Sequence, residues 1–258
     1  MRRIPFQLPP VPTENICITG QDATHIRKVL RMQQGDLLCL FDGRGNEYEA
    51  LIDSIDTKGV HLALTGIQRS IPAPPVHLDI AIALLKEKKI DELIRPLTEL
   101  GAGTIRIFPA ARSVPVLKKE KAEARMERWQ KLAMESLKQC CGSHMPEILF
   151  HKDSSPLLLD PAPGEKRFLF WEGTDSSQWS EGKKTAPLHI RAVFGPEGGF
   201  DPEEVQAFFR AGYKVLGLGP RILRAPTAVL AGTALLQYLY GDLSLPPFPG
   251  RWEGQGHP

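Results

Sequence analysis

Residues 189–200 read His-Ile-Arg-Ala-Val-Phe-Gly-Pro-Glu-Gly-Gly-Phe, an apolar run that leads directly into a loop rich in glycine. The run Ile190–Phe194 has the length of a short strand. Residues 201–204, Asp-Pro-Glu-Glu, then open a helix with a capping residue, a proline at the first position and acids in the first turn. A strand, a loop and a helix in this order form the repeating unit of a mostly parallel α/β sheet.

A second loop of this kind follows the next apolar run. Residues 219–224 read Gly-Pro-Arg-Ile-Leu-Arg, and residues 227–240 are apolar on almost every side, which predicts a buried helix. Both loops would follow strands at the sheet edge where ligands usually bind in α/β proteins. Each could instead be a simple tight turn. However, two arginines beside an apolar helix require an anionic partner or water, which favours a ligand site.

The alternation of strands and helices extends back to residue 76. Apolar runs of strand length occupy residues 76–85, 104–108, 148–150 and 168–171. Helical spacing marks residues 90–100 and residues 119–140. Pro96 lies inside the first of these helices and should kink or break it. We therefore expect an α/β domain over residues 76–242, followed by a flexible tail over residues 243–258.

Residues 1–70 have a different pattern of short strands joined by tight turns, which predicts a small barrel or compact sheet. A short helix is expected over residues 22–32, with Ile26, Val29 and Leu30 on its apolar side. Residues 71–75 contain three prolines and form the expected linker between the domains. The candidate nucleic-acid-binding side chains of the first domain are Arg2, Arg3, Arg27, Lys28 and Arg31.

Composition limits the classes of protein to which the chain can belong. Of its 258 residues 42% are hydrophobic and 24% are charged, which is typical of a globular protein. No apolar run approaches the ~18 residues needed to span a bilayer. The sequence contains no dinucleotide-binding fingerprint, no phosphate-binding Walker loop and no serine nucleophile elbow. The four cysteines have no metal-ligand spacing, so we expect free thiols, no metal and a cytoplasmic location.

The two late loops together carry a family resemblance. Residues 195–200, Gly-Pro-Glu-Gly-Gly-Phe, with residues 218–224, Leu-Gly-Pro-Arg-Ile-Leu-Arg, resemble the RsmE-type methyltransferases of the SPOUT superfamily. The similarity covers most of the chain, because further landmarks of the family match earlier in the sequence. These landmarks are residues 25–31, 35–36, 41–43, 99–101 and 129–131.

The resemblance implies a fold and an activity. The fold is an N-terminal PUA-like β-barrel followed by an α/β SPOUT domain with a deep trefoil knot, an exception to the rule against threaded chains. The activity is methylation of N3 of a uridine in 16S ribosomal RNA, with S-adenosylmethionine as cofactor. The partners are 16S rRNA or the small ribosomal subunit, and a second copy of the chain in a homodimer.

The resemblance also assigns residues. It makes Arg221 and Arg224 the candidate catalytic residues, as donors that stabilise negative charge on the uracil oxygens. Glu197 or Glu172 could accept the N3 proton, or either could bind the ribose or amino group of the cofactor. The expected cofactor-binding residues are Glu172, Gly173, Phe194, Gly195, Pro196, Glu197, Gly198, Gly199, Leu218, Gly219, Arg221, Ile222 and Leu223.

Two positions depart from the family pattern. Pro226 stands where relatives usually have an acid, and Gly142 stands where many have an arginine. Backbone contacts to the cofactor should survive both changes, whereas RNA positioning and catalysis depend on them more. Two other functions therefore stay open. One is methylation of another RNA position, in transfer RNA or at a ribose 2′-hydroxyl, and the other is a non-catalytic RNA-binding or ribosome-assembly role.

Overall fold

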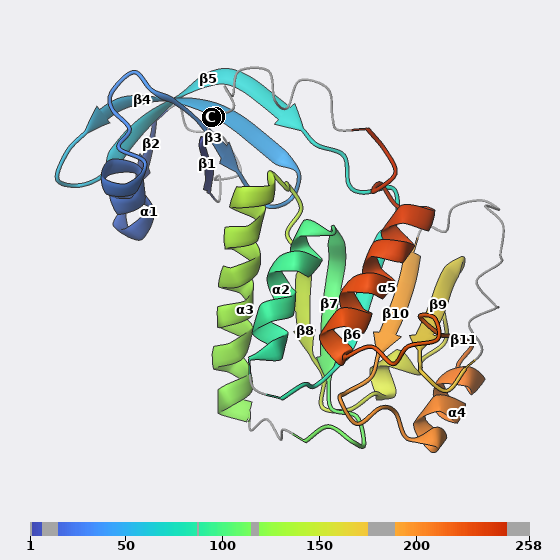
Figure 1. The fold of residues 1–258 in the computed structure, drawn as a ribbon. Helices are drawn as coiled ribbons and strands as arrows, with labels where there is room; N and C mark the ends of the chain where they lie inside the picture. Colours follow the sequence, from blue (N-terminus) through green and yellow to red (C-terminus); the bar gives the residue numbers. More distant parts are fainter. Residues whose placement is uncertain (1, 7–14, 87, 115–118, 175–188, 247–258) are drawn as a thin grey trace. The chain divides into compact units, whose positions relative to one another are not determined.

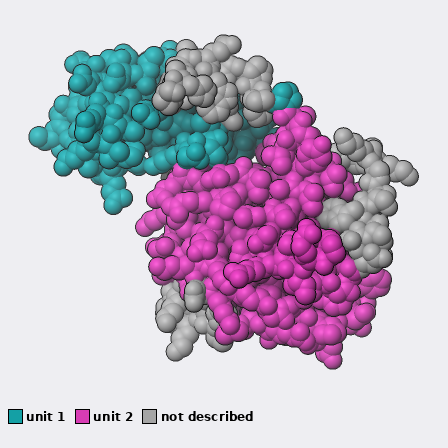
Figure 2. All heavy atoms as spheres, in the orientation of Figure 1, with its two compact units in different colours: residues 1–73, 138–144, 246–258 teal, residues 74–137, 145–245 magenta. Residues whose placement is uncertain are grey.

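The computed structural model describes residues 2–6, 15–86, 88–114, 119–174 and 189–246 (Figure 1). The chain divides into two compact units (Figure 2). Unit 1 comprises residues 1–73, 138–144 and 246–258, and unit 2 comprises residues 74–137 and 145–245. The division at Ala73 falls within the proline-rich segment. Most of the expected flexible tail, residues 247–258, lies outside the described residues.

Unit 1 is built on a five-stranded sheet with the order β1-β3-β4-β5-β2. Its strands are β1 (Arg2–Pro5), β2 (Asn15–Ile18), β3 (Leu37–Phe41), β4 (Asn46–Ile55) and β5 (Val60–Ser70). Strands β1 and β3 are parallel, and the other pairs are antiparallel. The strands expected in this part of the chain are therefore confirmed. Among the described strands, β1 and β2 are the outer ones and do not pair with each other.

The short helix expected near residue 26 consists of two pieces, α1 (Gly20–Thr24) and a π-helical turn, η1 (His25–Val29). In η1 the Leu30 N–H donates to the His25 carbonyl, five residues back, at 2.9 Å. This wider turn moves Val29 off the apolar side. Ile26 is fully buried, whereas the exposed fraction of Val29 is 65%, so the inward placement predicted for Val29 is wrong.

Residues 138–144 join unit 1 through a buried polar cluster. The Arg3 guanidinium pairs with Glu47, donates to the Gly142 carbonyl at 2.7 Å and lies over the Phe41 ring. The Ser143 hydroxyl donates to the same carboxylate. Because the Arg3 side chain is only 8% exposed, its guanidinium is not free to bind RNA phosphate. This corrects the sequence-based expectation for that residue.

Unit 2 contains a six-stranded sheet with the order β11-β9-β10-β6-β7-β8, and every pairing is parallel, as predicted. Its strands are β6 (His77–Ala83), β7 (Ala102–Phe108), β8 (Glu147–Phe150), β9 (Glu165–Phe170), β10 (His189–Phe194) and β11 (Lys214–Leu216). The chain runs outward from β6 through β7 to β8. It then returns to the opposite side, so that β10 lies between β6 and β9. The reversal of strand order makes the carboxyl ends of β6 and β10 a topological switch point.

Helices cover both faces of this sheet (Figure 1). On one face lie α2 (Lys89–Glu99), α3 (Lys119–Cys140) and α5 (Ala225–Tyr240), which form one apolar core with the strands. On the other lie α4 (Pro202–Arg210) and the 3-10 turn η2 (Ser155–Leu157).

Two predictions about these helices are corrected. Pro96 was expected to kink or break its helix, and the break is excluded because helix α2 continues through Pro96. The carbonyl deprived of a donor belongs to Glu92, an exposed residue. Helix α5 is buried on one side only. Val229 and Leu236 lie in the core, whereas Leu235 and Tyr238 are 41% and 59% exposed.

A buried carboxylate organises the α4 face of the sheet. Asp79 on β6 is completely buried, and both of its oxygens accept from Arg106 Nε at 2.8 and 2.9 Å. Arg191 Nε donates to Asp79 Oδ2 at 2.9 Å. Because Asp79 sits within an apolar run, nothing in the sequence indicated its two cationic partners on neighbouring strands.

Asp79→Ala should destabilise unit 2 strongly, because it leaves two largely buried guanidinium groups without their shared counter-charge. Removing one partner of a buried ion pair typically costs about 3–5 kcal/mol. Urea unfolding of the full chain measures the loss. Asp160→Ala, which changes an exposed aspartate of the same unit, is the matched control and should leave the midpoint unchanged. Equal midpoints for both variants would contradict this account.

Candidate functional site

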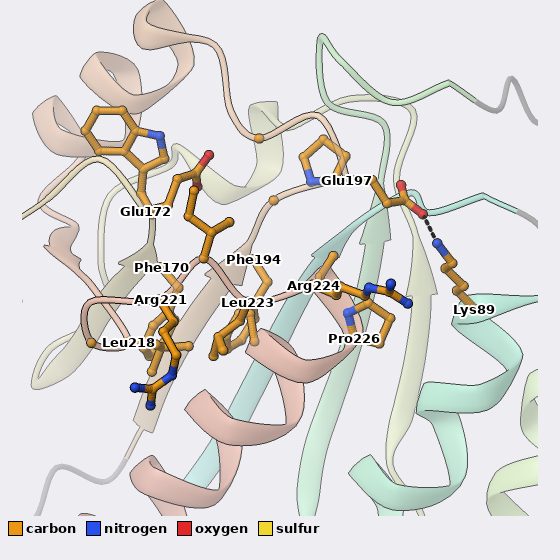
Figure 3. A pocket seen from close by; sticks show the side chains of 18 of the residues that line it. Lys89, Phe170, Glu172, Phe194, Glu197, Leu218, Arg221, Leu223, Arg224 and Pro226 are labelled. Atoms are coloured by element: carbon orange, nitrogen blue, oxygen red, sulfur yellow. Dashed lines mark hydrogen bonds and ion pairs between the residues drawn. The ribbon is translucent and has the colours of Figure 1, made fainter.

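A pocket of about 450 Å³ opens at the carboxyl ends of the strands in unit 2 (Figure 3). It lies at the topological switch point, and its volume is within the range of small-molecule sites, about 300–1,000 Å³. Its lining comes from the ends of β9 and β10, the loop before α5, the first turns of α5 and the start of α2. The lining residues are Lys89, Phe170, Trp171, Glu172, Phe194, Gly195, Pro196, Glu197, Gly199, Leu218, Gly219, Pro220, Arg221, Ile222, Leu223, Arg224, Ala225, Pro226 and Ala228.

The structure brings the two loops singled out in the sequence into this single pocket. All but two of the expected cofactor-binding residues line it, and so do both candidate catalytic arginines. The two exceptions, Gly173 and Gly198, are described but do not line it. Pro220 lies within the loop 218–223 that was expected to bind the cofactor. The lining residues that the sequence missed are Lys89, Phe170, Trp171, Ala225, Pro226 and Ala228. Lys89 had a usable signal, since it opens the helix that follows the apolar run 76–85.

Glu197 ties the loop 195–199 to the segment that follows β6. Its Oε1 accepts the backbone N–H of Lys86 at 3.1 Å and the Lys89 Nζ at 3.0 Å. Burial opposes ionisation of this carboxyl group, but backbone hydrogen bonds and Lys89 outweigh it and lower the pKa of Glu197. The carboxylate therefore stays ionised as a hydrogen-bond acceptor.

Gly198 lies against the segment that follows β7. Arg112 Nη1 donates to the Gly198 carbonyl at 3.4 Å, and Arg112 Nη2 pairs with Asp201 at 3.1 Å. A Cβ on Gly198 would lie 3.3 Å from the Arg112 side chain, which is tighter than ordinary contact. Asp201 begins α4 in a capping box with Glu204, whose carboxylate also accepts the Ala111 N–H at 2.8 Å.

Gly199 lies against the segment that follows β9. Its φ is +70°, and a Cβ there would come within 2.6 Å of Glu172 Oε1. The positive φ favours glycine at this position, and a side chain there would push the Glu172 carboxylate aside. Three consecutive residues, Glu197, Gly198 and Gly199, consequently contact the segments that follow three different strands of the sheet. This arrangement fixes the loop at the pocket wall.

The second loop leads into the first turn of α5. Arg224 is the N-cap residue of this helix, with extended backbone angles, and its carbonyl accepts the Ala228 N–H at 2.9 Å. The two arginines of the loop extend to different sides of the pocket (Figure 3). Arg224 lies with Pro226 on the side of the Lys89–Glu197 pair, whereas Arg221 lies on the side of Leu218. The positive end of the α5 dipole adds to the cationic character of the site.

The groups that line the pocket fit S-adenosylmethionine. Phe170, Trp171 and Leu218 offer apolar surface for an adenine ring. The carboxylates can accept from hydroxyl and ammonium groups, and the arginines can bind a carboxylate. Backbone N–H and C=O groups of the two glycine-bearing loops supply further donors and acceptors. Among the described residues, no group of histidine, cysteine, aspartate or glutamate side chains is arranged to hold a metal ion.

Unit 1 carries the basic side chains expected to contact RNA. Arg2, Lys28 and Arg31 are exposed, and Lys28 and Arg31 lie in and just after η1. Arg27 is half-buried and donates to the Asp56 carbonyl at 2.9 Å. All four cysteines of the chain are free thiols. No helix among the described residues combines the length and apolar character needed to cross a membrane.

Comparisons with known proteins also divide the chain into two parts. The sequence model of a family described as an RNA methyltransferase domain matches residues 72–237, and that of an RNA methyltransferase PUA domain matches residues 18–65. Ribosomal RNA small subunit methyltransferase E of Bacillus subtilis is 31% identical over 238 residues, which cover 90% of this chain and 92% of that protein.

Solved structures show the same architecture. A methyltransferase from Legionella pneumophila, in complex with the cofactor SAM, is 26% identical, with a TM-score of 0.83 over 93% of this chain and 98% of that chain. Ribosomal RNA small subunit methyltransferase E from Neisseria gonorrhoeae is 23% identical and shares the fold, with a TM-score of 0.80 over 94% and 99% of the two chains. The expected combination of a PUA-like domain and an α/β methyltransferase domain is confirmed.

Gly199→Ala should weaken S-adenosylmethionine binding, because its methyl group would displace the Glu172 carboxylate, which lines the pocket. Gly212→Ala is the matched control. Gly212 also has a positive φ, +83°, but nothing lies within 4 Å of the added Cβ. Both variants should lose similar stability, of order 1 kcal/mol, from backbone strain. Calorimetric titration separates the two effects, and equal loss of affinity in both variants would contradict the steric account.

Proposed function

We propose that this chain, which belongs to the RNA methyltransferase family of ribosomal RNA small subunit methyltransferase E, methylates N3 of a uridine in 16S ribosomal RNA. The methyl donor is S-adenosylmethionine, and the substrate is 16S rRNA or the small subunit that contains it, in the cytoplasm. The observation that carries the proposal is the pocket at the switch point, where loops 195–199 and 218–224 meet beside the start of α5.

The charges at the pocket suit removal of the uracil N3 proton. S-adenosylmethionine supplies a methyl group on a sulfonium centre. As the proton leaves N3, negative charge develops on the two flanking carbonyl oxygens. Arg221 and Arg224 line the pocket and provide cationic donors for such charge. They keep the catalytic role proposed for them, whereas the Lys89 ammonium is paired with Glu197.

The two carboxylates that line the pocket are not equivalent as proton acceptors. Glu197 is bonded to Lys86 and Lys89, and its lowered pKa makes it a weak base. Glu172 is exposed and stands beside Gly199. Of the two side chains, Glu172 is therefore the better candidate to accept the proton or to pass it to water.

RNA recognition is assigned in part to unit 1. The exposed cations Arg2, Lys28 and Arg31 suit contacts to phosphates, which position RNA without reading its sequence. The family match to an RNA methyltransferase PUA domain over residues 18–65 supports this role. The methyl transfer itself is assigned to unit 2.

The trefoil knot expected from the resemblance is part of the proposal. It is supported by the position of β10 between β6 and β9, strands that are far from one another in sequence. It is supported as well by the family match to an RNA methyltransferase domain. A knot around the pocket would hold its loops in place when the substrate binds.

A homodimer is proposed because one side of α5 is apolar and exposed. Leu235 and Tyr238 lie on this side, and Leu243 and Leu245, 52% and 59% exposed, follow the helix. A second copy of the chain, packed through the same surface, would bury these side chains in a two-fold interface.

Tyr238→Glu should convert the dimer to a monomer, because a carboxylate at the centre of an apolar interface loses its hydration. Sedimentation velocity measures the change. Leu159→Glu, at a leucine that is 66% exposed elsewhere in unit 2, is the control and should remain dimeric. A wild-type chain that sediments as a monomer would overturn the dimer.

The function is tested by incubating the protein with labelled S-adenosylmethionine and small subunits that lack the modification, followed by nucleoside analysis and mapping of the label. We expect 3-methyluridine in 16S rRNA. Label on a ribose 2′-oxygen or in transfer RNA would show that the enzyme methylates another RNA position. Binding of cofactor without any transfer to RNA would contradict it.

At saturating cofactor, Arg221→Ala and Arg224→Ala should lower kcat, by about 10²–10³-fold for a donor that stabilises the transition state. Arg221→Ala should also weaken cofactor binding, because Arg221 is an expected cofactor contact. Lys28→Ala/Arg31→Ala provides the contrast, because loss of phosphate contacts should raise the KM for RNA and leave kcat nearly unchanged. Steady-state kinetics at saturating cofactor measures both. Full activity in both arginine variants would remove them from catalysis.

A further inference from the structure

Lys89 is far in sequence from every other described residue that lines the pocket. The rest of the lining comes from residues 170–228, whereas Lys89 is the first residue of α2, which follows β6. Its side chain is 37% exposed, and its Nζ lies 3.0 Å from Glu197 Oε1. The Glu197 side chain turns toward Lys89 and away from Phe194 and Leu223 (Figure 3). Glu197 thus contributes its carboxylate to a contact at the rim of the pocket.

We propose that Lys89 is a positioning residue that latches the cofactor loop 195–199 to the start of α2 through the Glu197 carboxylate. This inference rests on the proposed function only in that the ligand of the pocket is S-adenosylmethionine. The ligand contacts the loop, the loop is held by Glu197, and Glu197 is held by Lys89. Lys89 therefore acts on cofactor affinity and does not take part in the methyl transfer.

Three features support a latch in preference to a direct role in binding or catalysis. The same oxygen, Glu197 Oε1, accepts both the Lys89 Nζ and the Lys86 N–H, so side-chain and backbone donors meet at one point. The far side of the loop is held in the same way by Arg112 at Gly198. Helix α2 is also anchored at its other end, where Gln237 of α5 donates to the Leu100 carbonyl at 2.6 Å. The latch therefore joins the loop to a helix that is anchored at its far end.

The test uses the full chain and four variants. Lys89→Met keeps the apolar stem but removes the charge, Lys89→Arg restores a cationic donor, and Glu197→Gln removes the acceptor charge. Lys88→Met is the matched control, because Lys88 precedes Lys89, is exposed and does not line the pocket. Calorimetry gives the Kd for S-adenosylmethionine without RNA, and kinetics with saturating RNA gives its KM and kcat.

Loss of a partly exposed ion pair should raise the Kd and the KM for the cofactor about fivefold in Lys89→Met. The kcat at saturating cofactor should stay within about twofold, since no group at the reacting atoms is lost. Lys89→Arg should restore most of the affinity, and Lys88→Met should match the wild type. The double variant Lys89→Met/Glu197→Gln should be no weaker than Glu197→Gln alone, because Glu197→Gln already removes the ion pair with Lys89.

A pH profile separates a charge latch from simple packing of the lysine stem. Lys89 helps to keep the pKa of Glu197 low, so in the wild type the latch is lost only as the pH falls through that lowered value. Lys89→Met has already lost the contact, so protonation of Glu197 should not change its affinity further. The affinity of the wild type should therefore fall toward that of Lys89→Met as the pH is lowered, while that of Lys89→Met stays constant.

Three results would overturn the latch: a drop in kcat with unchanged cofactor KM, additive effects in the double variant, or an equal effect of Lys88→Met. A different result would contradict the proposed function. A wild-type protein that binds S-adenosylmethionine but methylates no small subunit would contradict that function, while calorimetry would still decide on the latch.

Discussion

Everything at the pocket depends on the convergence of neighbouring chain segments on the loop 195–199. Glu197 bonds to the segment after β6, the Gly198 carbonyl accepts from Arg112 after β7, and Gly199 leaves space for Glu172 after β9. A parallel sheet brings the carboxyl ends of its strands to one edge, which makes this convergence available. In the sequence Glu-Gly-Gly, Glu197 supplies a charge and the two glycines supply space, so three consecutive residues make these three contacts.

This convergence explains how a loop without regular structure can hold a small molecule. A mobile loop would lose conformational freedom on binding, at a cost in affinity. Here the loop is fixed by ion pairs, backbone hydrogen bonds and close packing before any ligand arrives. Both the Glu197 side chain and the Gly198 carbonyl take part in this anchoring. The second loop supplies the cations, which stand on two sides of the pocket.

Much of unit 2 was predictable because its signals are local. Apolar runs followed by glycine or a helix cap gave the strands and α4, and the two glycine-bearing loops identified the pocket. The errors have physical causes that depend on distant residues or on backbone geometry. The partners of Asp79 lie on neighbouring strands, and the π-helical turn rotates Val29 outward. The buried side of α5 includes Thr233 and Gln237, whereas Leu235 and Tyr238 are exposed, so composition alone could not separate the two sides.

The central claim is that the two loops form a single S-adenosylmethionine pocket, and hydrogen–deuterium exchange with and without the cofactor tests it most directly. The account predicts slower exchange over residues 194–199 and 217–224 on addition of cofactor, together with residues 171–173, and unchanged exchange over β3 and β4 of unit 1. Protection of only one loop, or protection confined to unit 1, would contradict it.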